Sequence, residues 1–103
     1  MNDSILTSIK KLLGIDADYT HFDTDIIIHI NSAFATLNQL GVGPEFGFVI
    51  EDKYAMWEEY ITSSNLTMVK SYIFLKVRML FDPPTNSALL ESMKQTISEM
   101  EFR

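Results

Sequence analysis

The chain has 103 residues, enough for one domain with a modest core. Hydrophobic residues make up 47% of it and aromatic residues 12%, which excludes a disordered chain. With 14 acidic and 8 basic side chains the formal charge is −6, which argues against wrapping nucleic acid because phosphate contacts need a dense basic surface. The absence of cysteine excludes disulfide frameworks, thiolate nucleophiles and zinc ribbons.

The hydrophobic stretches are all short. None approaches the roughly 20 apolar residues that span a bilayer. The short apolar stretch near the N-terminus is interrupted by Lys10 and Lys11, so it is unlike a secretory signal. We expect a cytoplasmic protein that has no contact with a membrane.

Two helices are predicted in the first part of the chain. Apolar side chains recur at helical spacing in residues 3–13 and again in residues 24–40. Gly14 and Gly41 follow these segments, where a left-handed residue closes a helix. We expect Asp23 to be the N-cap of the second helix.

The middle of the chain is its least regular part. Residues 41–52 hold three of the four glycines, which predicts a loop. Within it the alternation of Phe46, Phe48 and Ile50 permits a short extended segment. A short helix follows, which we expect Asp52 to cap.

The second half predicts two further helices. Residues 66–81 carry an apolar stripe that runs to Leu80. Apolar residues cover more than half of the circumference of this predicted helix, which predicts a central position in the fold. Two prolines then stop this helix. A C-terminal helix over about 87–102, capped by Ser87, has a narrow apolar seam suited to docking on one partner helix. The sequence therefore predicts an all-α fold, with four to five helices in a compact bundle and a single domain over 1–103.

Four aspartates crowd the turn before the second helix: Asp16, Asp18, Asp23 and Asp25. A calcium loop counted from Asp16 needs a glycine at its sixth position and a glutamate at its twelfth, but the chain has His21 and Ile27 there. We therefore interpret the first two aspartates as turn residues. The other two fall at the start of a helix, where an anion is favoured.

No catalytic constellation emerges from the remaining polar residues. His21 and His29 are the only histidines, and neither has a second ligand at helical spacing. The glycines near residue 42 lack the Lys-Ser/Thr ending of a phosphate loop, and no serine motif of a hydrolase is present. Glu58 and Glu59 are adjacent on a helix and point in different directions. We predict that the protein is not an enzyme and that it holds no metal and no cofactor.

Charge is distributed unevenly along the chain. Residues 41–62 carry five acids against one lysine, a net of −4, whereas residues 63–81 carry a net of +3. Two explanations remain open. The acidic and basic segments pair within one chain, or the acidic loop of one subunit contacts the basic helix of the next subunit, in a head-to-tail contact that closes a ring. Trp57 is expected in the core rather than in an interface, and the two loop phenylalanines in either. The candidate interface residues are Phe46, Phe48, Glu51, Trp57, Glu58, Glu59, Lys70, Lys76 and Arg78.

The first part of the sequence resembles a known family. The stretch "IKKLLGIDADYTHFDTDIIIHINSAFATLNQLGVG" is similar to the opening of the small head–tail connector (adaptor) proteins of tailed bacteriophages and prophages. The matching phrase is Lys10, Leu13, Ile15 and Asp16, followed by an acidic turn and a helix that faces Ile27, Ile30, Ala33 and Leu37 inward. The later helix "LTMVKSYIFLKVRMLFDPP", with Lys70 near its start, is similar too. Residues 43–60 and the C-terminal helix carry no signature of that family.

This resemblance implies a structural virion protein that is made in the host bacterial cytoplasm. Such connectors form a ring below the portal, extend the DNA channel and join the capsid to the tail or to a stopper protein. The implied partners are further copies of the chain, the portal protein and the tail or stopper protein, with DNA passing through without specific binding. Two alternatives remain open, a small helical DNA-binding regulator and an adaptor that binds a host protein.

Overall fold

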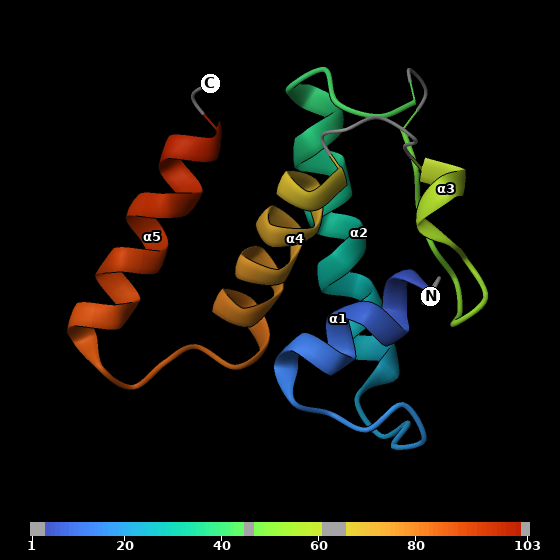
Figure 1. Ribbon diagram of the computed structural model, residues 1–103, viewed down its shortest axis with the longest axis horizontal. Helices are drawn as coiled ribbons and strands as arrows, with labels where there is room; N and C mark the ends of the chain where they lie inside the picture. The colour runs from blue at the N-terminus through green and yellow to red at the C-terminus, as the bar shows by residue number, and fades with distance from the viewer. Residues whose placement is uncertain (1–3, 45–46, 61–65, 102–103) are drawn as a thin grey trace.

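The computed structural model describes residues 4–44, 47–60 and 66–101 (Figure 1). Regular structure in these ranges is helical, which confirms the all-α prediction. The helices are α1 (Ile5–Leu13), α2 (Asp23–Gln39), α3 (Trp57–Tyr60), α4 (Leu66–Phe81) and α5 (Ser87–Glu101). The predicted bounds of α4 agree with the structure at both ends, because an apolar stripe and two prolines mark them.

Helix α4 lies at the centre of the molecule and packs against α1, α2 and α5 (Figure 1). Its buried face carries Val69, Ile73 and Val77, which meet the inward faces of α1 and α2. The predicted stripe is wrong at Leu80, whose side chain is 54% exposed. Leu80 lies one residue before the helix ends and the chain turns away, so its neighbours no longer cover it.

The C-terminal ends of α1 and α2 follow the predicted signals, whereas the predicted caps of α5 and α3 are exceptions. Gly14 and Gly41 adopt left-handed conformations with φ of 82° and 84° and close α1 and α2 as expected. At the start of α5, however, Asn86 Oδ1 accepts a hydrogen bond from Leu89 N at 3.1 Å, so Asn86 is the cap and Ser87 is the first helical residue. An asparagine directly before a serine offers two competing caps, and the structure uses the first.

The short helix α3 is the second exception. It begins at Trp57, and Asp52 does not cap it. The Asp52 carboxylate instead accepts a hydrogen bond from Tyr54 N at 2.9 Å, which forms a local turn. Glu59 Oε2 accepts from Met56 N at 2.8 Å, so a side chain inside α3 satisfies the backbone at its start.

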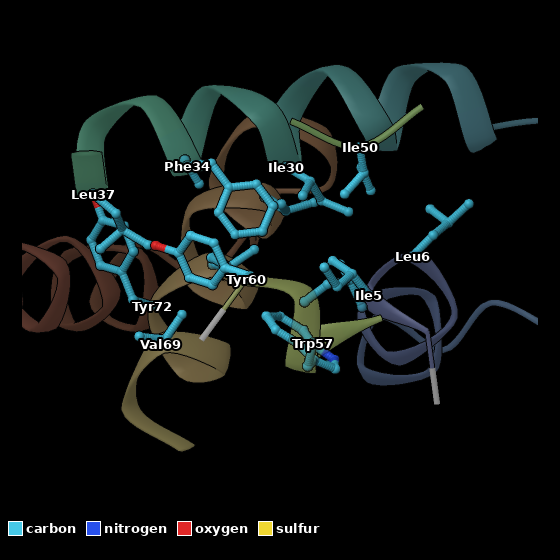
Figure 2. Packing of buried hydrophobic residues seen from close by; sticks show 14 of the residues in the cluster. Ile5, Leu6, Ile30, Phe34, Leu37, Ile50, Trp57, Tyr60, Val69 and Tyr72 are labelled. Carbon is cyan, nitrogen blue, oxygen red and sulfur yellow. The ribbon is translucent and has the colours of Figure 1, made fainter. Parts of the chain in front are cut away.

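The segment before α3 runs along α2 and contributes Ile50 to the core (Figure 2). Asn31 on α2 holds this segment by two hydrogen bonds to the backbone of Ile50. Further along, Ile5 N donates to Ala55 O at 2.9 Å, and Ser4 forms an isolated antiparallel bridge with Met56. No strand is present in the described residues, so residues 41–44 and 47–52 are irregular, as predicted.

Helix α5 docks on α4, as its narrow seam predicted (Figure 1). Met93 and Ile97 are the buried residues of α5. Near the C-terminal end of α5, Glu101 Oε2 accepts a hydrogen bond from Tyr72 Oη at 2.7 Å and lies 3.4 Å from Lys76 Nζ. A hydrogen bond and an ion pair thus supplement the small apolar contact between α4 and α5. In the part of the chain that the structure describes, no helix has the length and hydropathy needed to cross a membrane.

Candidate interaction surfaces

The acidic turn between α1 and α2 is organised around a buried lysine. Lys10 is only 2% exposed, and its Nζ donates to Ala17 O at 3.0 Å and to Tyr19 O at 2.7 Å. The same nitrogen lies 2.8 Å from Asp23 Oδ1. Burying a cation is costly unless carboxylate and carbonyl oxygens surround it, and these three oxygens do so.

This arrangement corrects the predicted role of Asp23. The N-cap residue of α2 is Phe22, and no side-chain hydrogen bond caps the helix. Asp23 is instead the first helical residue, and its carboxylate faces Lys10. The sequence pattern missed the burial of Lys10, because a lysine in the last turn of a helix is usually solvated beside the helix dipole.

Asp16 and Asp18, the first two aspartates of the turn, are not gathered into a cluster of ligands among the described residues. Asp16 and Asp18 are exposed, and Asp16 O accepts a backbone hydrogen bond from Tyr19 N at 3.1 Å. Among the described residues no group of three or more His, Cys, Asp or Glu side chains could hold a metal ion. The geometry of Asp16 is therefore that of a turn residue, as interpreted.

The aromatic candidates lie largely inside this chain. Trp57 is 3% exposed, and its Nε1 donates to Ser8 Oγ at 3.0 Å, which confirms its expected place in the core. Phe48 is half-buried, and its ring centroid lies 5.3 Å from those of Phe34 and Tyr60. Phe46 lies outside the described residues.

The basic candidates on α4 already have neighbours within the chain. Lys70 Nζ lies 5.3 Å from the centroid of the Trp57 ring, in position for a cation–π contact. Lys76 pairs with Glu101 of α5, and Arg78 is half-buried. Within the described ranges no ion pair joins the acidic segment, residues 41–62, to α4. The alternative that these two segments pair within one chain is therefore not observed among these residues.

The acidic candidates differ in how much of their surface is free. Glu51 and Glu58 are exposed. Glu59 is also exposed but accepts the hydrogen bond from Met56 N. The carboxylates of Glu51 and Glu58 therefore face solvent, whereas Glu59 has a structural task as well.

The surface formed by the described residues has a shallow depression and an apolar pocket beside the candidate residues. A shallow one of about 430 Å³ lies between residues 48–52 and residues 54–59. A smaller apolar pocket of about 180 Å³ lies where the ends of α2, α4 and α5 meet, lined by Leu37, Met68, Tyr72 and Met100 among others.

Two buried tyrosines have perturbed acidity. Burial raises the pKa of Tyr60 to about 12. Burial, together with the hydrogen bond to Glu101, raises the pKa of Tyr72 well above its usual value. Both phenols therefore keep their protons to a higher pH than an exposed tyrosine does.

Almost the whole chain, residues 5–103, matches the family model described as phage connector protein. The chain belongs to the phage connector protein family. The match extends through residues 43–60 and the C-terminal helix, where the sequence alone showed no family signature. No curated protein and no solved structure matched it.

Membership of the connector family bears on the exposed residues around the shallow depression and on the basic residues of α4. Phage connectors are structural proteins of the virion, and they work through contacts with other virion proteins. The exposed residues around the shallow depression and the basic residues of α4 are therefore candidates for such contacts. The buried Lys10 and Trp57 support the fold beneath them.

Proposed function

We propose that this connector assembles as a ring below the portal and joins the capsid to the tail or a stopper protein. The observation that carries the proposal is the family match over residues 5–103. The protein is made in the host cytoplasm and becomes part of the virion. It acts through its shape and its contacts, without catalysis, a metal or a cofactor.

Neighbouring subunits contact each other head to tail in this proposal. The acidic segment around α3 on one subunit faces the basic side of α4 on the next, and such heterologous contacts close into rings. Glu58 is exposed and supplies the acidic side, whereas Lys70 and Lys76 supply the basic side. Because Lys76 also pairs with Glu101, reversing its charge would loosen α5 as well as the ring.

A mixing experiment separates contacts between subunits from contacts within one. The first variant combines Lys70→Glu with Lys76→Gln, and the second carries Glu58→Lys. Each alone brings like charges together in a ring, whereas an alternating mixture restores opposite charges at every contact. We expect assembly on the purified portal, measured by co-sedimentation, to fall for each variant and to recover in the mixture.

Two controls complete this experiment. Lys76→Gln alone measures the effect of loosening α5, and circular dichroism verifies that each variant is folded. Equal co-sedimentation of the wild type and both variants would remove the charge contact. A monomer in dilute solution does not contradict the proposal, because the ring can form on the portal alone.

DNA passes through the ring without specific binding in this proposal. A protein of net charge −6 offers few phosphate anchors, so it does not hold the moving DNA. We expect no mobility shift of duplex DNA at about 0.15 M salt. A tight complex that weakens steeply with salt would instead support the DNA-binding regulator. Recovery of the chain with a host protein, and its absence from virions, would support the host adaptor.

A further inference from the structure

The segment of residues 48–51 has the side-chain pattern of a β-strand, although it belongs to no sheet. Phe48 and Ile50 turn toward the core, whereas Val49 and Glu51 are exposed. This alternation has the period of two residues that an extended chain produces. Figure 1 shows the segment running beside α2 before the chain turns back toward α3.

One edge of this segment is paired by a side chain. Asn31 Oδ1 accepts from Ile50 N at 2.8 Å, and Asn31 Nδ2 donates to Ile50 O at 3.0 Å. These are the two bonds that a residue of a neighbouring strand would exchange with Ile50. In an extended chain the backbone groups of the flanking residues point the opposite way, so those of Val49 and Glu51 lie along the other edge.

No described residue pairs with that second edge. No hydrogen bond joins the backbone N–H or C=O of Val49 or Glu51 to any other described residue. Exposed backbone groups in a row are a template for pairing with another chain. Within the described chain, these four residues thus have one edge on which Asn31 pairs Ile50 and one edge without a backbone partner.

The side chains around this second edge indicate which kind of chain would fit. Tyr54 and Val49 are the most exposed large hydrophobic residues of the described chain, at 73% and 66%, and both line the shallow depression. The carboxylates of Glu51, Asp52 and Glu59 lie on the same surface. An exposed apolar patch with a charged rim is typical of a protein contact.

We propose that residues 48–51 bind an extended, basic segment of another protein as an added β-strand. Backbone bonds to Val49 and Glu51 hold the segment, its aliphatic side chains cover Val49 and Tyr54, and its Lys or Arg side chains face the carboxylates. Apart from Lys53, which stands alone in the turn next to this segment, the described basic residues lie on α1, α4 and α5, so the described chain offers no extended basic segment of its own. The occupant is therefore a different protein.

This proposal goes beyond ring formation and does not require it. It assigns Glu51 to a different protein and leaves Glu58 to the contact between subunits. Peptide binding by a chain that fails to join the portal would uphold this inference alone. A ring that forms without any peptide binding would uphold the proposed function alone.

A designed peptide with alternating charge and bulk tests the proposal directly. The probe is the capped peptide GKVKVKG, titrated into the ¹⁵N-labelled full chain and followed by NMR. We expect the amide signals of Val49 and Glu51 to shift most and their hydrogen exchange to slow. The acidic peptide GEVEVEG should leave them unchanged, and GKVKVKG N-methylated at both valines should bind more weakly.

Two variants separate backbone pairing from side-chain contact. Val49→Pro removes the N–H of residue 49, and we expect binding about fivefold weaker, as for the loss of one hydrogen bond. Val49→Ala is its matched control and should stay within about twofold of the wild type. Glu51→Lys keeps the backbone and should also weaken binding of the basic peptide, so the test survives if the proline variant fails to fold.

Several results would overturn the proposal. These are signal shifts centred elsewhere, an equal response to the acidic peptide, or equal binding by the proline variant, if folded, and the alanine variant. If the same amides shift when the protein alone is concentrated, a second copy of the chain is the occupant, and the assignment to a different protein is wrong.

Discussion

Two irregular segments of this connector use their polar groups in opposite ways. In the turn between α1 and α2, the carbonyls of Ala17 and Tyr19 and the carboxylate of Asp23 all meet the buried Lys10. In the segment before α3, Asn31 holds Ile50, and the backbone groups of Val49 and Glu51 have no hydrogen-bond partner among the described residues. The polar groups of the first segment are paired within the chain, whereas the second has an edge to which we assign a partner. The acidic residues of the first therefore support the fold, and we assign interaction to the second.

The largest expected effect comes from removing the centre of the turn between α1 and α2. Lys10→Met leaves the Asp23 carboxylate and two carbonyls without their cation, which we expect to lower the free energy of unfolding by about 3 kcal/mol. Urea unfolding followed by circular dichroism measures this. Lys11→Met, at the exposed neighbouring position, is the control and should change stability by less than about 0.5 kcal/mol. Equal losses for both variants would show that the buried contacts of Lys10 contribute nothing specific.

The next largest effect concerns residues 48–51, the segment before α3. Asn31→Ala removes both bonds to Ile50 and should cost about 2 kcal/mol, because two buried backbone groups lose their partner. Hydrogen exchange should rise most at the amide of Ile50. Asn38→Ala, on an exposed position of the same helix, provides the comparison. Unchanged exchange at Ile50 would mean that Asn31 does not hold the segment.

Lys10 and Asn31 also show the limit of what the sequence could predict. The apolar stripes and the glycine and proline signals were sufficient for the main helices, since they depend on neighbours within a few residues. The roles of Lys10 and Asn31 depend on contacts up to 19 residues away along the chain, which no local pattern reports. Asp23 was misassigned for the same reason, because a capping aspartate and an ion-paired one occupy the same place in a sequence.

The candidate interface was less predictable than the fold. The uneven distribution of charge along the sequence could not show that Lys76 pairs with Glu101 of α5, whereas the burial of Trp57 was predicted correctly. Val49 and Tyr54 were not singled out by the sequence, since lone apolar residues in a loop give no signal. Only the three-dimensional arrangement places them on one depression.

A third prediction concerns the loop that leads into residues 48–51. At Gly43, where φ is 88°, an added Cβ would lie 2.6 Å from Tyr60 Cε1, whereas at Gly41 it would meet nothing within 4 Å. Both positions are left-handed, so alanine is strained at each, but only Gly43→Ala also displaces the Tyr60 ring. We expect it to destabilise the protein by about 1.5 kcal/mol more than Gly41→Ala in thermal or urea unfolding. Equal losses would show that Tyr60 moves aside freely.

The smallest effect appears at high pH. Tyr60 and Tyr72 have raised pKa values in the folded protein, so the unfolded chain loses these protons first as the pH rises above about 10. Stability is therefore full below that pH and should fall above it, by at most about 1.4 kcal/mol per pH unit for each tyrosine. Urea unfolding between pH 9 and 11 measures the slope. Tyr72→Phe should reduce the slope, and an unchanged slope would contradict the role of that phenol.

The central claim is that this chain is a structural connector that joins others as a ring. Cryo-electron microscopy of virions of the phage that encodes it tests this most directly. The account predicts a closed ring directly below the portal into which α1, α2, α4 and α5 fit. Virions with a complete neck but no density for this fold, and no trace of the chain by mass spectrometry, would contradict it.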